Sequence, residues 1–88
     1  MTKGTLQGKK IAILVTDAFE QIEMTSPRDA IHAAGGQTEI VSLKPGEIQG
    51  LNHIDKADKF KVDKTVKDVK ATDYDALLVP GGAVNPDA

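Results

Sequence analysis

Cysteine is absent from this sequence of 88 residues. The chain can therefore form no disulfide and can supply no thiolate nucleophile of its own. With two histidines and no cysteine, it also cannot build a zinc site of the Cys/His type. We expect no metal and no other cofactor.

Aromatic residues and an excess of basic charge are also missing. Aromatic residues make up 3% of the chain and the formal net charge is −2, so a nucleic acid would find neither stacking platforms nor a basic patch. The longest apolar run, Ile11 to Val15, is far shorter than the ~20 residues that span a bilayer. The first ten residues lack the apolar core of a signal peptide. We expect a cytoplasmic protein that binds neither nucleic acid nor membrane.

The hydrophobic pattern predicts an α/β fold in a single domain over residues 1–88. Lys10–Val15 and Asp75–Val79 each consist of one charged residue followed by a continuous apolar run, as in parallel strands that are covered on both faces. Thr38–Leu43 alternates between polar and apolar residues and predicts another strand. A helix between the first two strands completes a βαβ unit.

That helix is predicted over Glu20–Ala34 in two parts. Ser26 and Pro27 match an N-cap followed by proline at the first helical position, so the second part should begin there. Gly35 and Gly36 supply the glycine that commonly ends a helix.

The middle of the chain predicts smaller elements. Ile48–Leu51 and Lys59–Asp63 can form a two-stranded ribbon joined by a polar loop, Asn52–Asp58. Lys64–Asp73 has Val66 and Val69 at helical spacing and predicts a short surface helix.

Two buried parallel strands need covering helices and neighbouring strands, and this chain offers few. After Gly82 only six residues remain, and they stop in the middle of a pattern. The sequence therefore resembles the front of a larger domain.

Glu20 and Glu23 are the first candidate site residues, because they follow the first strand at its carboxyl end. In open α/β sheets, ligands bind at that edge. If the segment is helical, residues three apart share a face, and two neighbouring carboxyl groups cannot both ionise cheaply. One kept protonated could donate a hydrogen bond to an anionic nucleophile. Alternatively, both acids merely complement the helix dipole, for about 0.3–1 kcal/mol each.

Gly81 and Gly82 follow the last strand and are the second candidate. Consecutive glycines let backbone N–H groups approach a developing oxyanion, but they also make any tight turn. His53, in the polar loop with Asn52 and Asp55, is a further candidate.

Together these residues resemble a known family. The stretches KKIAILVTDAFEQIEMTSPRDAIHAAGGQTEIVSL and DYDALLVPGGAVNPDA are similar to the amino-terminal half of the PfpI intracellular-protease family, which belongs to the class I glutamine amidotransferase-like superfamily. The resemblance covers nearly the whole chain. The long Gln49–Asp63 segment resembles a bacterial stress-protein subgroup.

The resemblance implies a flavodoxin-like sheet with flanking helices, of which this chain holds the amino-terminal portion of a three-layer sandwich. It also implies a cysteine nucleophile on a strand-to-helix elbow, acting in peptidase, glyoxalase or deglycase chemistry on a small carbonyl compound or peptide. Glu23 would donate a hydrogen bond to the sulfur, and Glu20 would lie beside it near a dimer contact. Gly81 and Gly82 would face the oxyanion.

The resemblance further implies a homodimer or a higher oligomer. Because the chain has no cysteine, we expect it to be catalytically inactive by itself and to supply part of a PfpI-like cysteine hydrolase. A non-enzymatic α/β module that associates with itself or with a partner chain remains the alternative, since an unfinished sheet invites association. A small anion-binding domain that uses the two glycines is a third reading.

Overall fold

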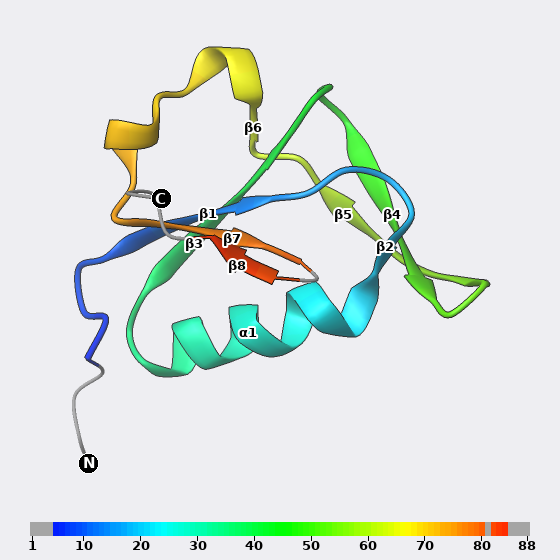
Figure 1. Ribbon diagram of the computed structural model, residues 1–88, viewed down its shortest axis with the longest axis horizontal. Coiled ribbons are helices and arrows are strands. Elements are labelled where there is room, and N and C mark those ends of the chain that lie inside the picture. Colours follow the sequence, from blue (N-terminus) through cyan, green and yellow to red (C-terminus); the bar gives the residue numbers. More distant parts are fainter. Residues whose placement is uncertain (1–4, 81, 85–88) are drawn as a thin grey trace.

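The apolar runs form the centre of a five-stranded sheet (Figure 1). The computed structural model describes residues 5–80 and 82–84. Strand β1 (Lys10–Leu14) lies between β3 (Gln37–Ser42) and β7 (Ala76–Val79) and is parallel to both. This arrangement confirms the predicted α/β fold with a parallel sheet.

Two short strands complete the sheet in the order β6-β3-β1-β7-β8. β6 (Lys64–Thr65) is parallel to β3, and β8 (Gly82–Val84) is antiparallel to β7. The three main parallel strands occur in the order β3-β1-β7, which corresponds to the start of the flavodoxin-like order.

The segment between β1 and β3 forms one continuous helix, α1 (Gln21–Ala33). The predicted second start at Ser26 is wrong, because Pro27 lies inside the helix and Glu20 is the N-cap residue. Met24, in the first turn, is completely buried and fixes that turn on the core. This packing outweighs the local preference for a new helix start at the Ser-Pro pair.

The predicted ribbon belongs to a second sheet with the order β2-β4-β5. β4 (Glu47–Asn52) pairs with β5 (Asp55–Lys61) in antiparallel orientation, and β2 (Phe19–Glu20) is parallel to β4. The predicted loop over Asn52–Asp58 is wrong, because Asn52 pairs with Asp55 and the turn consists of residues 53–54 alone. The start of β5 is polar because most of its side chains face solvent.

The surface helix predicted over Lys64–Asp73 is also wrong. The segment contains β6 and two short 3₁₀ turns, η1 (Val66–Asp68) and η2 (Ala71–Asp73). The acids that close these turns bond locally. Asp68 accepts a hydrogen bond from the Thr65 hydroxyl, and Asp73 accepts one from the Lys70 N–H at 2.8 Å. Such local bonds compete with helix formation.

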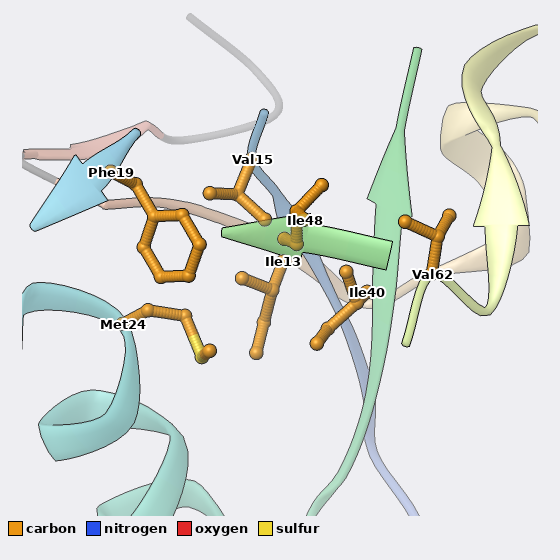
Figure 2. Close-up of a cluster of buried hydrophobic side chains, with 7 residues drawn as sticks. All are labelled: Ile13, Val15, Phe19, Met24, Ile40, Ile48 and Val62. Carbon is orange, nitrogen blue, oxygen red and sulfur yellow. The ribbon is translucent and has the colours of Figure 1, made fainter. Parts of the chain in front are cut away.

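The hydrophobic core joins the two sheets and the helix (Figure 2). Met24 from α1 and Phe19 from β2 contact apolar side chains of the large sheet and of the hairpin β4–β5. The buried cluster consists of Ile13, Val15, Phe19, Met24, Ile40, Ile48 and Val62. The hairpin is therefore part of the core that holds the start of α1 in place.

Candidate functional site

The candidate site lies where the parallel strands end. β1 and β7 run in the same direction in register, with Ile11 opposite Ala76 and Ile13 opposite Leu78. The segment after β1 and the segment after β7 therefore leave from the same edge of the sheet, as predicted. Of the two predicted glycines, Gly82 begins β8, while Gly81 lies outside the described residues.

The chain leaves β1 through a segment that the hairpin holds in an unusual conformation. Ala18 has a φ of 65°, in the left-handed region that non-glycine residues rarely occupy. Its N–H donates to the carbonyl oxygen of Gln49 at 2.9 Å, and Asp17 Oδ1 accepts from the Gln49 N–H at 2.9 Å. Such a conformation costs of order 1–3 kcal/mol and persists only where its surroundings over-determine it. These two bonds supply that restraint.

Glu20 is tied to the same hairpin by its backbone and by its side chain. Its backbone pairs with Leu51 in the β2–β4 bridge. Both carboxylate oxygens lie 3.2 Å from the backbone nitrogen of His53, which donates to them. His53 lies in the turn between β4 and β5 with a φ of 59°, and its N–H points to the carboxylate. Glu20 thus orders the hairpin turn next to the candidate site.

Glu23 lies in the first turn of α1, and its side chain is exposed. Glu20 precedes the helix in an extended conformation, with φ −71° and ψ 115°. The prediction that Glu20 belongs to the helix is therefore wrong. The negative charge of Glu23 in the first turn complements the helix dipole.

Gln21 and Gln49 hold the hairpin where its strand pairing is irregular. The β4–β5 register shifts between Gln49 and Leu51. Near this bulge the Gln21 amide donates to the Asp58 carboxylate at 2.9 Å and accepts from the Asp58 N–H at 2.7 Å. Gln49 Nε2 donates to the carbonyl oxygens of Gly50 and Ala57, at 2.7 and 3.1 Å. Side-chain hydrogen bonds thus take the place of the backbone hydrogen bonds between β4 and β5 that the bulge interrupts.

Gly50 allows the close approach that these bonds require. A Cβ atom at this position would lie 2.7 Å from Gln21 Oε1 and 3.2 Å from the carbonyl oxygen of Asp58. No side chain can occupy that space without moving its neighbours. The glycine therefore lets the start of α1 pack directly on β4.

An open hollow of ≈ 460 Å³ lies between the start of α1 and the end of β4. Its lining combines carboxylate, amide and imidazole groups with aliphatic side chains. The lining residues are Glu20, Gln21, Ile22, Thr25, Leu51, Asn52 and His53. The structure thus brings Glu20 and His53 together, an association that their separation in the sequence does not indicate.

The described residues 5–80 and 82–84 contain no group of three or more histidine, aspartate or glutamate side chains that could hold a metal ion. Within the same residues, no helix is long and apolar enough to cross a membrane.

Tyr74 forms a separate polar cluster near the amino end of β1. Its hydroxyl donates to Glu39 Oε1 at 2.8 Å, and Lys10 Nζ lies 5.3 Å from the centre of its ring. Burial raises the pKa of Tyr74 to about 12. The hydrogen bond to Glu39 and the negative charges of Glu39, Asp73 and Asp63 act in the same direction. The cluster is a structural contact between β3 and the entry to β7.

Sequence reasoning missed the residues that hold the site segment. Asp17, Gln21, Gln49 and Asp58 bond across separations of 32 and 37 residues. The only local signal for these contacts was Gly50. A glycine within a strand indicates either a bulge or the close approach of another segment to the strand backbone.

Comparison with known proteins shows which family this sequence matches. The profile of the DJ-1/PfpI family matches residues 9–88. The chain is 49% identical over 75 residues to the "Putative cysteine protease YraA" of Bacillus subtilis, covering 84% of this chain and 42% of that protein. It is 44% identical over 75 residues to the "Uncharacterized protein SH1084" of Staphylococcus haemolyticus, covering 84% and 41%.

A solved structure shows the same fold. The ThiJ/PfpI domain protein from Brachyspira murdochii superposes with a TM-score of 0.70 at 19% identity, over 90% of this chain and 43% of that one. The chain thus spans less than half the length of the relatives and of the solved structure that it matches.

Proposed function

This chain belongs to the DJ-1/PfpI family, and from that membership we propose that it supplies the amino-terminal part of the active site of a cysteine hydrolase. The nucleophilic cysteine would come from outside these 88 residues, which contain none. The reaction would be of the peptidase, glyoxalase or deglycase type on a peptide or a small carbonyl compound. The name of the Bacillus subtilis relative, a putative cysteine protease, supports the hydrolase class.

The observation that carries the proposal is the shared sheet edge. β1 and β7 are parallel neighbours, so the segments that contain Glu23 and Gly82 both start from their carboxyl ends. Ligand sites of open α/β sheets lie at this edge. The family match extends over both segments.

The proposed reaction needs two kinds of support at that edge. A thiolate adds to a carbonyl carbon, forming a C–S bond while the carbonyl electron pair moves to the oxygen. Glu23, in its protonated form, would donate a hydrogen bond to the sulfur and so favour the thiolate. Backbone N–H groups of Gly81 and Gly82 would receive the oxyanion. Glu20 would act indirectly, because its carboxylate accepts the His53 N–H.

A chimera tests this proposal. In the chimera, this chain is followed by the carboxyl-terminal part of the Bacillus subtilis relative, which lies beyond the region that the two proteins share. The readout is the rate of thiol alkylation by iodoacetamide as a function of pH, which needs no knowledge of the substrate. A hydrogen bond to a charged group is worth ~1.5–3 kcal/mol. We therefore expect Glu23→Ala to raise the pKa of the reactive thiol by about one to two pH units.

The matched control is Glu47→Ala, which removes an exposed glutamate at the start of β4. It should leave the alkylation profile unchanged. A folded chimera whose Glu23→Ala variant titrates like its parent would show that Glu23 does not act on the sulfur. The 88-residue chain by itself contains no cysteine and should therefore show no thiol alkylation by iodoacetamide.

A further inference from the structure

One carboxylate holds the chain where it turns from β1 toward the start of α1. Asp17 Oδ1 accepts the backbone N–H of Gln49 at 2.9 Å, and the carbonyl oxygen of Gln49 accepts the N–H of Ala18 at 2.9 Å. Both polar backbone groups of Gln49 are therefore bonded to this segment. In Figure 1 the segment runs as an arc from the end of β1 to β2, which pairs with β4.

The bond to Asp17 extends the pairing of β2 with β4. The first backbone pair of the two strands joins Phe19 to Gly50. The bond from Gln49 to Asp17 lies just before that pair, and the aspartate oxygen takes the role of a backbone carbonyl. Ala18, at the junction, has a φ of 65°. Without this restraint, Ala18 would return to the negative φ that alanine prefers.

The conformation of Ala18 determines where α1 begins. β2 follows Ala18 directly, and α1 follows β2 without a connecting loop. Phe19 in β2 and Met24 in the first helical turn belong to the same buried cluster, so β2 and the helix start form one packed unit. A rotation about the backbone of Ala18 would shift this unit as a whole. Glu23 lies in that turn with its side chain exposed, so the position of its carboxyl group depends on the backbone of the turn.

We propose that Asp17 is a positioning residue for the proposed reaction. By accepting the Gln49 N–H, its carboxylate keeps Ala18 in the left-handed conformation and so places the Glu23 carboxyl group within reach of the sulfur. The strength of a hydrogen bond falls steeply when donor and acceptor are misaligned, so a small displacement of Glu23 is enough to weaken it. The inference rests on the proposed function, because it requires Glu23 to donate to that sulfur.

The direction of the pKa change separates this role from two others. A displaced Glu23 would no longer favour the thiolate, so loss of the Asp17 bond should raise the pKa of the reactive thiol. A direct effect of charge would do the opposite, because removal of a nearby negative charge favours the thiolate and lowers that pKa. A purely structural role would lower the stability of the fold and leave the thiol pKa unchanged.

The chimera with the Bacillus subtilis relative allows the measurement, through the pH dependence of alkylation by iodoacetamide. Asp17→Ala should raise the thiol pKa by about half to one pH unit, part of the shift expected for Glu23→Ala. Asp17→Asn loses the charge but keeps an acceptor oxygen, so it should titrate like the parent chimera. The matched control is Asp29→Ala on α1, where the side chain is 71% exposed and lies 3.6 Å from Arg28 of the same helix. It should also titrate like the parent.

A combined variant tests whether the effect of Asp17 acts through Glu23. In a Glu23→Ala background, Asp17→Ala should cause no further rise, because two residues that act through one contact are not additive. A rise that persists in this background would overturn the inference. So would an unchanged pKa in a folded Asp17→Ala chimera, or a fall in both Asp17 variants. If Glu23→Ala shifts the pKa and Asp17→Ala does not, this inference fails alone. If Glu23→Ala itself has no effect, the proposed function fails with it.

An Ala18→Gly background serves if Asp17→Ala alone does not fold. Glycine adopts a φ of 65° without strain, so the fold depends less on the restraint from Asp17 there. Glycine also permits other conformations once the restraint is gone. Asp17→Ala should therefore still raise the thiol pKa relative to Ala18→Gly alone. Equal pKa values in these two chimeras would contradict the positioning role.

Discussion

The carboxylate of Glu20 accepts the backbone N–H of His53, with both of its oxygens 3.2 Å from that nitrogen. The two residues are 33 positions apart in the sequence and belong to β2 and to the hairpin turn. A side chain predicted as part of a chemical site thus fixes the hairpin that forms one wall of that site. This contact therefore ties the candidate site segment to the turn of the β4–β5 hairpin.

Replacing Glu20 should loosen the hairpin turn. Glu20→Ala removes the acceptor of the His53 N–H, so we expect faster hydrogen exchange at His53 and a loss of about 1 kcal/mol in the free energy of unfolding. Glu20→Gln keeps a carbonyl oxygen as acceptor and should lose less than half as much. Amide exchange followed by NMR and urea denaturation measure the two effects. Unchanged exchange at His53 in Glu20→Ala would show that the contact is not populated in solution.

Replacing Pro27 should stabilise the helix. Proline has no N–H, so Pro27 cannot donate to the carbonyl of Glu23 four residues earlier, within α1 (Gln21–Ala33). Pro27→Ala restores that donor, and we expect a gain of about 1 kcal/mol in the free energy of unfolding, measured by urea denaturation. Ala30→Ser, at an exposed position of the same helix, is a control that should lose a few tenths of a kcal/mol. A destabilised Pro27→Ala variant would mean that the proline ring is needed for packing.

The only tyrosine of the chain gives a direct optical reading of the cluster around Tyr74. Its pKa is raised to about 12, so the folded state holds the phenolic proton to higher pH than the unfolded state, whose pKa is about 10. The stabilisation by this group is fully present below pH 10 and is lost as the pH rises toward 12. Absorbance at 295 nm should show the raised midpoint.

Two variants separate the causes of that shift. Glu39→Gln removes the nearby charge and should move the tyrosine midpoint toward 10. Tyr74→Phe should flatten the fall in stability between pH 10 and 12 relative to the parent chain. A midpoint near 10 in the folded parent chain would show that neither burial nor Glu39 perturbs the hydroxyl.

Sequence patterns predicted the parts of the fold that depend on local hydrophobicity. The continuous runs at Ile11–Val15 and Ala76–Val79 indicated parallel strands covered on both faces. Both runs do pair as parallel strands, but only β1 is buried, and the residues of β7 are all partly exposed. The resemblance supplied the family, and the general rule for open α/β sheets supplied the edge at which a site is expected. The proposed roles of Glu23, Glu20, Gly81 and Gly82 stay predictions.

Local signals failed where tertiary contacts outweighed them. Pro27 looked like a helix start, but buried Met24 extends the helix past it toward β2. The polar residues of β5 looked like a loop, but they form a solvent-facing strand on β4.

By itself, the sequence determined the α/β class, the parallel strands, and the absence of any thiol from the chain, since these follow from residue types and their spacing along the chain. Only the tertiary structure decided that Glu20 turns to His53, that Gln21 and Gln49 hold the bulge, and that Ile54 projects beside a hollow. The contacts of Glu20 and Gln21 join residues 33 and 37 positions apart, the contacts of Gln49 depend on the irregular pairing of two strands, and the place of Ile54 depends on the shape of a surface. No local pattern encodes which backbone group a side chain will reach in the folded chain.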